Sequence, residues 1–212
     1  MSRIDFYGFV GAAIGIFVGM IGHEYAHARV AVSLGDPTPR MMGRLTFNPK
    51  AHVDPFGTLI MPAVFLFTIL FRASFGFFFG YAKPVTVHPG RMRKPGRDAI
   101  LVALAGPAFN LALAAAAGYG FQKTLDTSIN LATVFYWVTI INSFLFIINI
   151  LPIPPLDGSR ILTRFLSPSA AMKLQDYGQY LILFLLALFL IFPKVLENMG
   201  QAVYCPLLGS PC

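Results

Sequence analysis

The sequence predicts an all-α polytopic membrane protein, with about five transmembrane helices and one short re-entrant β element. Hydrophobic residues make up 56% of the 212 residues and charged residues only 12%, and the mean hydropathy is +0.68. These values are far more apolar than those of an average soluble domain. Stretches of about 20 apolar residues, the length that crosses a bilayer, lie near residues 6–30, 57–80, 99–120, 130–151 and 177–193. We therefore expect one integral-membrane domain over residues 1–212.

The first apolar stretch carries no charge from Phe6 to Gly22 and then runs directly into the polar segment "HEYAHAR". It is too long for the apolar part of a signal peptide, so we expect it to remain as a helix. Within it Gly11, Gly15 and Gly19 recur every four residues. This spacing keeps the glycines close to one face of an α-helix, where a neighbouring helix can approach closely.

Basic residues concentrate in three connections between the apolar stretches. The positive-inside rule places such connections in the cytoplasm, and we expect the amino terminus and the carboxyl-terminal tail on the outside of the cell membrane. This distribution explains the net charge of +7 without a nucleic-acid partner. The three basic groups are Arg29, Arg40, Arg44 and Lys50; Lys83, Arg91, Arg93, Lys94 and Arg97; and Arg160, Arg164 and Lys173.

The second apolar stretch has to leave the cytoplasmic side and return to it, because residues 29–55 and 81–98 are both expected there. We expect a helix in "GTLIMPAVFLFTILF" and extended backbone in "RASFGFFFGYAKPV". Non-helical backbone at membrane depth is tolerated only inside protein or beside an aqueous cavity. The extended part is therefore either a peptide-binding edge or a packed part of the core.

The segment from His23 to His27, "HEYAH", predicts a metal site at membrane depth. Histidines at positions i and i+4 of a helix can bind one metal ion, and a glutamate between them can act as the base for a metal-bound water. The chain has only four histidines and two glutamates, and half of each occur in these five residues. Ionisable groups at this depth are costly and usually functional. Zinc fits, because catalytic zinc uses three protein ligands and keeps one position for water.

A third ligand is needed, and Asp157 in "NILPIPPLDGSR" is the strongest candidate. It follows the fourth apolar stretch, which would deliver it to the same depth as the histidines. The prolines before it prevent a continuous helix, and Gly158 allows a sharp turn. An Asp-Gly pair after prolines also occurs as an ordinary turn or helix N-cap, so the local features leave both interpretations open. His52 and His88, which lie in loops, are weaker candidates.

The segments "HEYAH" and "NILPIPPLDG", with "AGPAFN" between them, resemble the site-2 protease family of intramembrane zinc metalloproteases. The resemblance extends from about His23 to Leu162, and the paired HExxH and NxxPxxxLDG motifs in this order are highly specific. It implies that His23, His27 and Asp157 bind one zinc ion and that Glu24 is the general base. The protein would then hydrolyse a peptide bond within or next to a transmembrane helix of a membrane-protein substrate, with the active site toward the cytoplasmic side.

Two asparagines match the family motifs. Asn149 matches the asparagine of the second motif, and Asn110 matches that of the GxxxN element in "AGPAFN". We expect Asn149, and as a second choice Asn110, to stabilise the oxyanion that forms during hydrolysis. The alternative for each is an interhelical hydrogen bond, the usual role of an asparagine in a membrane helix.

No segment is long enough for the PDZ or CBS domains that many family members carry, so the resemblance implies a minimal catalytic core. The sequence leaves open the oligomeric state and whether a separate regulatory partner protein exists. The tail residues Cys205 and Cys212 are spaced so that they can form a disulfide in an oxidising compartment.

Other functions compete with proteolysis. A transporter would also contain buried polar groups, but its signature of inverted repeats is not visible in the apolar stretches. A di-iron hydroxylase would need more than the four histidines present. A non-catalytic metal-binding scaffold is harder to separate. Glu24 argues against it, because a structural zinc site does not need a base.

Overall fold

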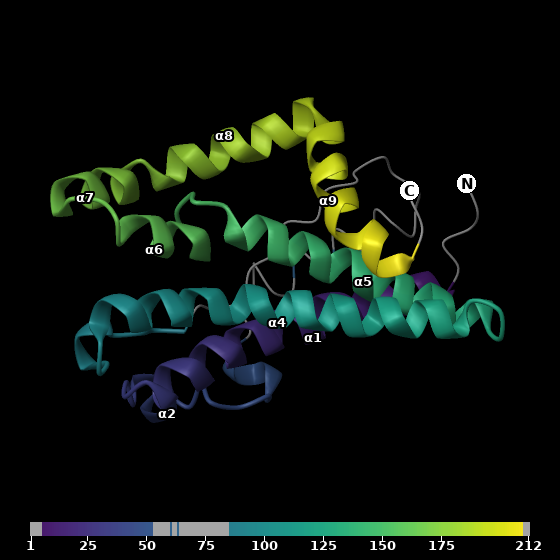
Figure 1. Cartoon of the computed structure of the whole chain (residues 1–212), viewed down its shortest axis with the longest axis horizontal. Helices are drawn as coiled ribbons and strands as arrows, with labels where there is room; N and C mark the ends of the chain where they lie inside the picture. Colours follow the sequence, from purple (N-terminus) through teal and green to yellow (C-terminus); the bar gives the residue numbers. More distant parts are fainter. Residues whose placement is uncertain (1–5, 53–59, 61–62, 64–84, 210–212) are drawn as a thin grey trace.

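The computed structural model describes residues 6–52, 60, 63 and 85–209, and the regular structure of this part of the chain is helical. Three long helices, α1 (Phe6–Ser33), α4 (Pro95–Thr124) and α5 (Ile129–Ile150), form the centre of the molecule (Figure 1). The shorter elements are α2 (Thr38–Met41), η1 (Pro49–Ala51), η3 (Pro89–Arg91), α6 (Asp157–Thr163), α7 (Pro168–Asp176), α8 (Gly178–Ile191) and α9 (Pro193–Leu208).

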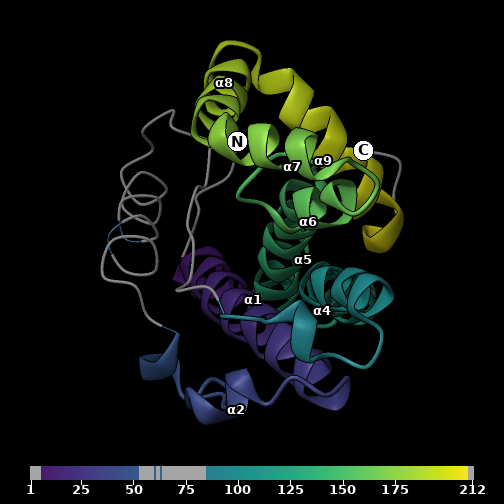
Figure 2. The ribbon, with the colours of Figure 1, turned by 90° about the vertical axis from the view of Figure 1, so that its left-hand side faces the viewer.

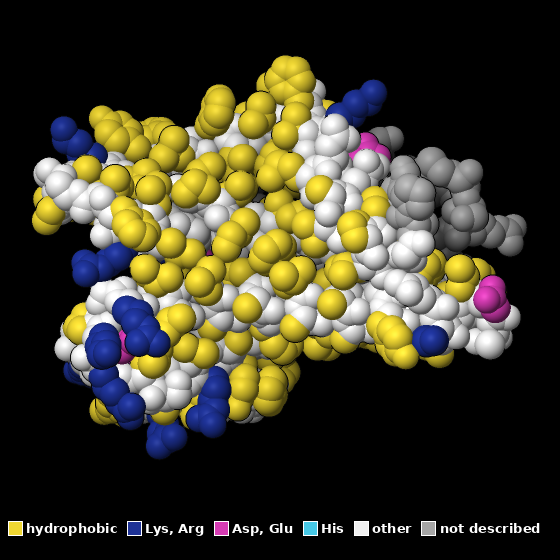
Figure 3. Space-filling view, viewed as in Figure 1, with side chains coloured by type: hydrophobic (Ala, Val, Ile, Leu, Met, Phe, Trp, Pro, Cys, Tyr) yellow, Lys and Arg dark blue, Asp and Glu magenta, His cyan; other side chains and the backbone are white. Residues whose placement is uncertain are grey.

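Consecutive long helices run in opposite directions (Figure 1). Each of the three packs against the other two (Figure 2). Each has the length and apolar composition needed to cross a membrane. At 1.5 Å per residue, the 22 residues of α5 extend about 33 Å, which matches the hydrocarbon thickness of a bilayer. Buried side chains of α1 and α5, among them Ile16 and Ile141, form one hydrophobic cluster. Much of the outer surface is also apolar (Figure 3), as expected for a protein in lipid.

The glycine stripe of α1 faces α5, which confirms the prediction from its spacing. A Cβ atom added at Gly11 would lie 2.6 Å from the carbonyl oxygen of Val134. One added at Gly15 would lie 3.2 Å from the Cα atom of Val138. The two backbones therefore approach more closely than larger side chains would allow. This close approach sets how far the functional side chains of α1 lie from those of α5.

The end of α1 and the start of α4 lie at the same end of the bundle (Figure 1). The Arg93 N–H donates to the carbonyl oxygen of Leu34 at 3.1 Å. The carboxylate of Asp36, which is fully buried, accepts hydrogen bonds from the N–H groups of Thr38 at 3.0 Å and of His88 at 2.7 Å. The chain that leaves α1 thus returns to the same end, as the charge pattern predicts.

Most of the described lysine and arginine side chains gather at this end (Figure 3). They belong to the end of α1 and the loop after it, to the start of α4, and to α6 and α7. By contrast, Lys123 is at the far end of α4. The basic connections that were predicted to share one side of the membrane therefore share one end of the bundle, as far as the described residues extend.

The number of predicted transmembrane helices is confirmed only in part. Among the described residues, α1, α4 and α5 are long and apolar enough to cross a membrane singly. The fifth predicted stretch forms α8, whose 14 residues extend only about 21 Å, and the chain then bends by 88° into α9. Pro193 begins α9, and a proline cannot continue the hydrogen-bonded ladder of a preceding helix.

Two predictions fall on other parts of the chain. The predicted span near residues 57–80 and most of the predicted β element lie outside the described residues. Val85, the last residue of that element, is described and has no strand assigned to it. Neither the five spans nor the re-entrant β element is therefore confirmed. Cys205 is disulfide-bonded, whereas Cys212 lies outside the described residues.

Candidate metal centre

Two histidines lie one turn apart in the second half of α1. His23 and His27 are separated by four residues, which places their side chains on one face of the helix. Their rings meet edge to face, with centroids 4.6 Å apart and planes at 83°. Both are buried, so the imidazoles are held between α1 and its neighbours rather than extended into solvent.

The turn after α5 brings Asp157 to these histidines. The helix α5 ends at Ile150, where the prolines of "LPIPPLDG" prevent further helix, and α6 begins at Asp157 itself. A Cβ atom added at Gly158 would lie 2.5 Å from the carbonyl carbon of Ile150, so only glycine allows α6 to pack this tightly against α5. Asp157 is not a helix cap, because the N-cap of α6 is Leu156 and no side chain caps that end.

Three side-chain atoms from α1 and α6 converge on one point. The Nε2 atoms of His23 and His27 each lie 3.0 Å from Oδ2 of Asp157. They also lie 3.0 Å from each other. Within the described part of the chain, this is the group of histidine, cysteine and acidic side chains arranged to hold a metal ion.

The protons of the two imidazoles face away from this point. Nδ1 of His23 lies 2.7 Å from Oδ1 of Asn110, and Nδ1 of His27 lies 2.6 Å from the carbonyl oxygen of Val102. Both oxygens can only accept, so in each neutral ring the proton is on Nδ1. The Nε2 atoms then direct lone pairs toward each other and toward the carboxylate. Such a group needs a cation among its members, and two imidazole nitrogens with a carboxylate oxygen suit zinc.

Asn110 and Asn142 form a hydrogen-bond chain behind His23. Asn110, on α4, donates from Nδ2 to the carbonyl oxygen of Gly19 at 3.1 Å and to Oδ1 of Asn142 at 3.0 Å. These two acceptors determine which end of the Asn110 amide faces His23. Asn142, on α5, donates in turn to the carbonyl oxygen of Gly15 at 3.2 Å. Both asparagines are fully buried, so three helices together orient one imidazole.

Gly106 of α4 faces the histidine pair directly. A Cβ atom added there would lie 2.5 Å from both Nε2 and Cε1 of His23. Asn110 follows one helical turn later and accepts the proton of the same imidazole. The GxxxN element therefore has two functions at this site, because its glycine makes room for the ring and its asparagine orients it.

Glu24 follows His23 in α1, and its carboxylate is held by a segment far along the chain. The Val85 N–H donates to Oε2 of Glu24 at 2.9 Å, and the side chain is buried at 9% exposure. No described residue donates a hydrogen bond to its Oε1 atom. The same extended segment is anchored at its other end by the bond from the His88 N–H to Asp36. One oxygen of Glu24 is therefore held by Val85, and the other has no donor among the described residues.

Most of the predicted site residues are connected by hydrogen bonds at this centre, whereas Asn149 bonds within its own helix. Its Nδ2 atom donates to the carbonyl oxygen of Leu145 on the same helix at 2.9 Å, and no hydrogen bond between described residues connects it to the histidines. His52 contacts the carbonyl oxygen of Thr46 through Nε2 at 2.8 Å. It therefore belongs to the loop after α2 and not to the metal centre.

Three residues shape the centre although the predicted motif roles do not include them. Asn142 is one, and its signal was present in the sequence: a polar residue in the apolar run "TIINSFLF" is costly unless it is hydrogen-bonded. Gly106 lies inside a recognised motif, but the motif alone does not indicate what it faces. Asp36 carried no signal, because its partner His88 is 52 residues away in the chain.

Comparisons with known proteins agree with this geometry. The model of Peptidase family M50 matches residues 121–193. A Bacillus subtilis (strain 168) protein named "Putative zinc metalloprotease YwhC" is 34% identical over 206 residues, covering 93% of this chain and 85% of that protein. The Mycobacterium tuberculosis (strain ATCC 25618 / H37Rv) protein named "Putative zinc metalloprotease Rip2" is 32% identical over 189 residues, covering 86% and 67% of the two chains. No solved structure matches the chain.

Proposed function

Because the chain belongs to peptidase family M50, the site-2 protease family of zinc metalloproteases, we propose that it hydrolyses a peptide bond within or next to a transmembrane helix of a membrane-protein substrate. One observation carries this proposal. Three lone-pair atoms from His23, His27 and Asp157 converge at 3.0 Å spacings, and a buried glutamate is adjacent to the first of them in the chain. We assign the three residues as ligands of one zinc ion.

Glu24 is the proposed general base. Zinc at this centre would supply Lewis-acid chemistry, which activates water and polarises a carbonyl group. The Val85 N–H fixes Oε2 of Glu24, so Oε1 is the atom that takes the proton from the attacking water. The same carboxyl group then returns this proton to the leaving amine. A carboxylate held at one oxygen only can accept and release a proton without rearranging its support.

The two asparagines receive different roles. Both hydrogens of the Asn110 amide are used, toward Gly19 and Asn142, and its oxygen faces His23. Asn110 is therefore assigned to orient the imidazole. Asn149 uses one amide hydrogen toward Leu145, and no described residue accepts the second. It remains the proposed donor to the oxyanion that forms during hydrolysis.

The substrate helix has to unwind before it can be cut, because the carbonyl groups of an intact helix are already hydrogen-bonded within it. The positive-inside rule supports a cytoplasmic location for the basic end of the bundle, which also carries the metal ligands of α1 and α6. We accordingly propose that cleavage occurs toward the cytoplasmic side of the membrane.

The direct test uses purified protein in detergent and a panel of single-span membrane polypeptides. We expect about one zinc per chain by elemental analysis. Glu24→Gln should keep its zinc, but its cleavage rate should be about 100-fold to 10,000-fold lower, because this is the usual contribution of a general base. Glu197→Gln is the matched control, because Glu197 is exposed and is the other glutamate of the chain. Normal cleavage by Glu24→Gln would contradict the assignment of the base.

A non-catalytic zinc scaffold is the second candidate. In that case the protein would bind zinc but cleave no member of the panel. The parent protein and Glu24→Gln would then be indistinguishable. Asp157→Ala tests the ligand assignment separately, because a variant that lacks a zinc ligand should lose the zinc as well as the activity. Zinc retained at the parental level in Asp157→Ala would remove Asp157 from the ligand set.

A further inference from the structure

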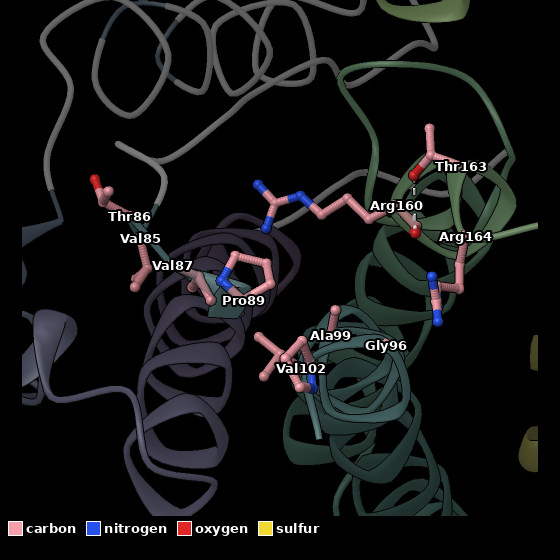
Figure 4. Close-up of a pocket in the computed structure, with 11 residues that line it drawn as sticks. Val85, Thr86, Val87, Pro89, Gly96, Ala99, Val102, Arg160, Thr163 and Arg164 are labelled. Carbon is pink, nitrogen blue, oxygen red and sulfur yellow. Dashed lines mark hydrogen bonds between the residues drawn. The ribbon is translucent and has the colours of Figure 1, made fainter. Parts of the chain in front are cut away.

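A cavity of about 660 Å³ lies beside the metal centre (Figure 4). Its walls are the segment 85–87 with Pro89 at the start of η3, the first turns of α4, and α6. It shares two residues with the centre: the Val85 N–H holds Glu24, and the Val102 carbonyl oxygen accepts from His27. A group bound in this cavity is therefore next to the residues that support the proposed base and one proposed ligand.

Two guanidinium groups line this cavity. Figure 4 shows Arg160 reaching across it toward the segment around Thr86 and Val87, while the guanidinium of Arg164 lies beside Gly96. None of the described residues that line it is an aspartate or a glutamate. Among the described residues, neither arginine forms an ion pair with a carboxylate. The cavity therefore carries positive charge without a partner from the described part of the chain.

This charge arrangement favours an anionic guest. Arg160 and Arg164 repel each other across a shared space, and the nearby first turn of α4 adds the positive end of a helix dipole. A planar guanidinium binds a carboxylate through two parallel hydrogen bonds. The rest of the lining is largely apolar, with Val87, Ala99 and Val102 among its residues. A carboxylate carried on an otherwise apolar group fits both properties.

The extended wall favours a peptide as the carrier of that carboxylate. In the described structure, no backbone hydrogen bond is made by Thr86 or Val87. As far as the described residues extend, the N–H and C=O groups of Thr86 and Val87 are therefore open to pairing with an extended chain laid alongside. A lipid headgroup offers no repeating backbone for this wall to pair with. The guest is thus better explained as a peptide segment than as a lipid.

We propose that this cavity selects substrates with an acidic side chain in the segment next to the cut bond, and that Arg160 is the main partner of that side chain. Arg164 is the second partner, at the edge of the same cavity. This inference rests on the proposed proteolytic function, since it names a property of the substrate. It assigns Arg160 and Arg164 a role in specificity that is separate from the setting of membrane topology.

The test compares the binding of two peptide probes that differ in one side chain. One probe is a dansyl-labelled, amidated hexapeptide of valine and alanine with one central glutamate, and the other carries glutamine in its place. Binding is measured by fluorescence anisotropy with zinc-loaded Glu24→Gln protein in detergent at low salt. We expect the glutamate peptide to bind about 5- to 10-fold more tightly, the effect of a partly exposed charge-assisted pair.

Charge reversal provides the decisive comparison. In the same background, Arg160→Gln should lose most of the preference for the glutamate peptide, since only Arg164 remains, and Arg160→Glu should prefer a third peptide with a central lysine. Lys173→Gln is the matched control, because it removes an exposed basic residue of α7 that does not line the cavity. It should keep the glutamate preference, whereas a general surface-charge effect would reduce the preference in both variants.

Equal binding of the glutamate and glutamine peptides by the Glu24→Gln protein would overturn the inference. If short-chain phosphatidylglycerol then bound in an Arg160-dependent way, the cavity would be assigned to a lipid headgroup. The proposed proteolytic function is tested separately, by measuring cleavage with protein that retains Glu24. Absence of cleavage there would contradict that function without changing the binding comparison.

Discussion

The two sides of the metal centre differ in how their polar groups are paired. Behind His23, Asn110 and Asn142 are fully buried, and their amide groups bond to one another and to backbone carbonyls. On the opposite side, Arg160 and Arg164 are exposed at a cavity and lack a carboxylate partner among the described residues. The first side is complete without a guest, so it holds the ligands still. The second has charge that no described carboxylate neutralises, which is why we propose that it binds part of the substrate.

The largest expected effect comes from filling the space that the paired side leaves for the histidines. In Gly106→Ala the added methyl group would lie 2.5 Å from Nε2 of His23, so the imidazole has to move away from the other ligands. We expect zinc content below about one tenth of the parental value and no measurable cleavage, because overpacking at a rigid site displaces the ligand itself.

Gly118→Ala is the control for this prediction. It introduces a similar clash on the same helix, 2.6 Å from the carbonyl oxygen of Leu207, but at a position that packs on α9. It should lower thermal stability and leave the zinc content near one per chain. Parental zinc content in Gly106→Ala would show that α4 does not press against the histidine pair.

A smaller loss of zinc affinity is expected when the hydrogen-bond chain behind His23 is interrupted at Asn142, one hydrogen bond away from the imidazole's own partner. In Asn142→Leu the Nδ2 group of Asn110 loses an acceptor, and the amide is free to turn its other end toward His23. Zinc affinity should fall about 10- to 100-fold, the usual cost of removing the partner of a metal ligand. Competition with a chelating fluorophore measures this change.

Thr139→Val tests whether the effect depends on the chain of amides. Thr139 is equally buried on α5, and its hydroxyl donates to the carbonyl oxygen of Phe135 within the same helix at 2.9 Å. Its replacement should leave zinc affinity unchanged. An equal loss in Thr139→Val and Asn142→Leu would point to general weakening of α5 packing instead.

The smallest effect is expected at Asp36, which anchors the extended wall of the cavity side. In Asp36→Asn a carboxylate oxygen is replaced by an amide N–H that faces the N–H of Thr38 or His88. The unfolding temperature at pH 7 should drop by about 3 to 6 °C, as expected for a hydrogen bond to a charged group in a chain of this size. Zinc content should not change. Asp176→Asn, at an exposed position of α7, should have no such effect.

The pH dependence of this difference gives an independent check. Burial acts to raise the pKa of Asp36, but the hydrogen bonds from Thr38 and His88 outweigh it and lower the pKa below the ordinary value. A carboxyl group with a lowered pKa in the folded state stabilises the fold above its unfolded pKa, and this contribution is lost as the pH falls through the folded pKa. The difference in unfolding temperature between parent and Asp36→Asn should therefore shrink below about pH 4. A constant difference would exclude the charged form as its cause.

The sequence predicts the candidate metal ligands better than it predicts the residues that hold them in place. The spacing of His23 and His27 follows from one helical turn, and the depth of Asp157 follows from the length of the preceding apolar stretch. These are local properties that a sequence carries directly. The fifth predicted span was less accurate, because hydropathy does not report the bend at Pro193.

What the sequence by itself determined is the identity of the candidate donor residues and their order along the chain, and it predicts a common membrane depth for them. What only the tertiary structure decided is which groups surround those donors. Val85 reaches Glu24 across 61 residues and Asp157 reaches His23 across 134 residues. Such contacts depend on how closely whole helices approach, which is set by packing at positions like Gly15 and Gly106. Helical periodicity describes only one helix at a time, so it cannot contain that information.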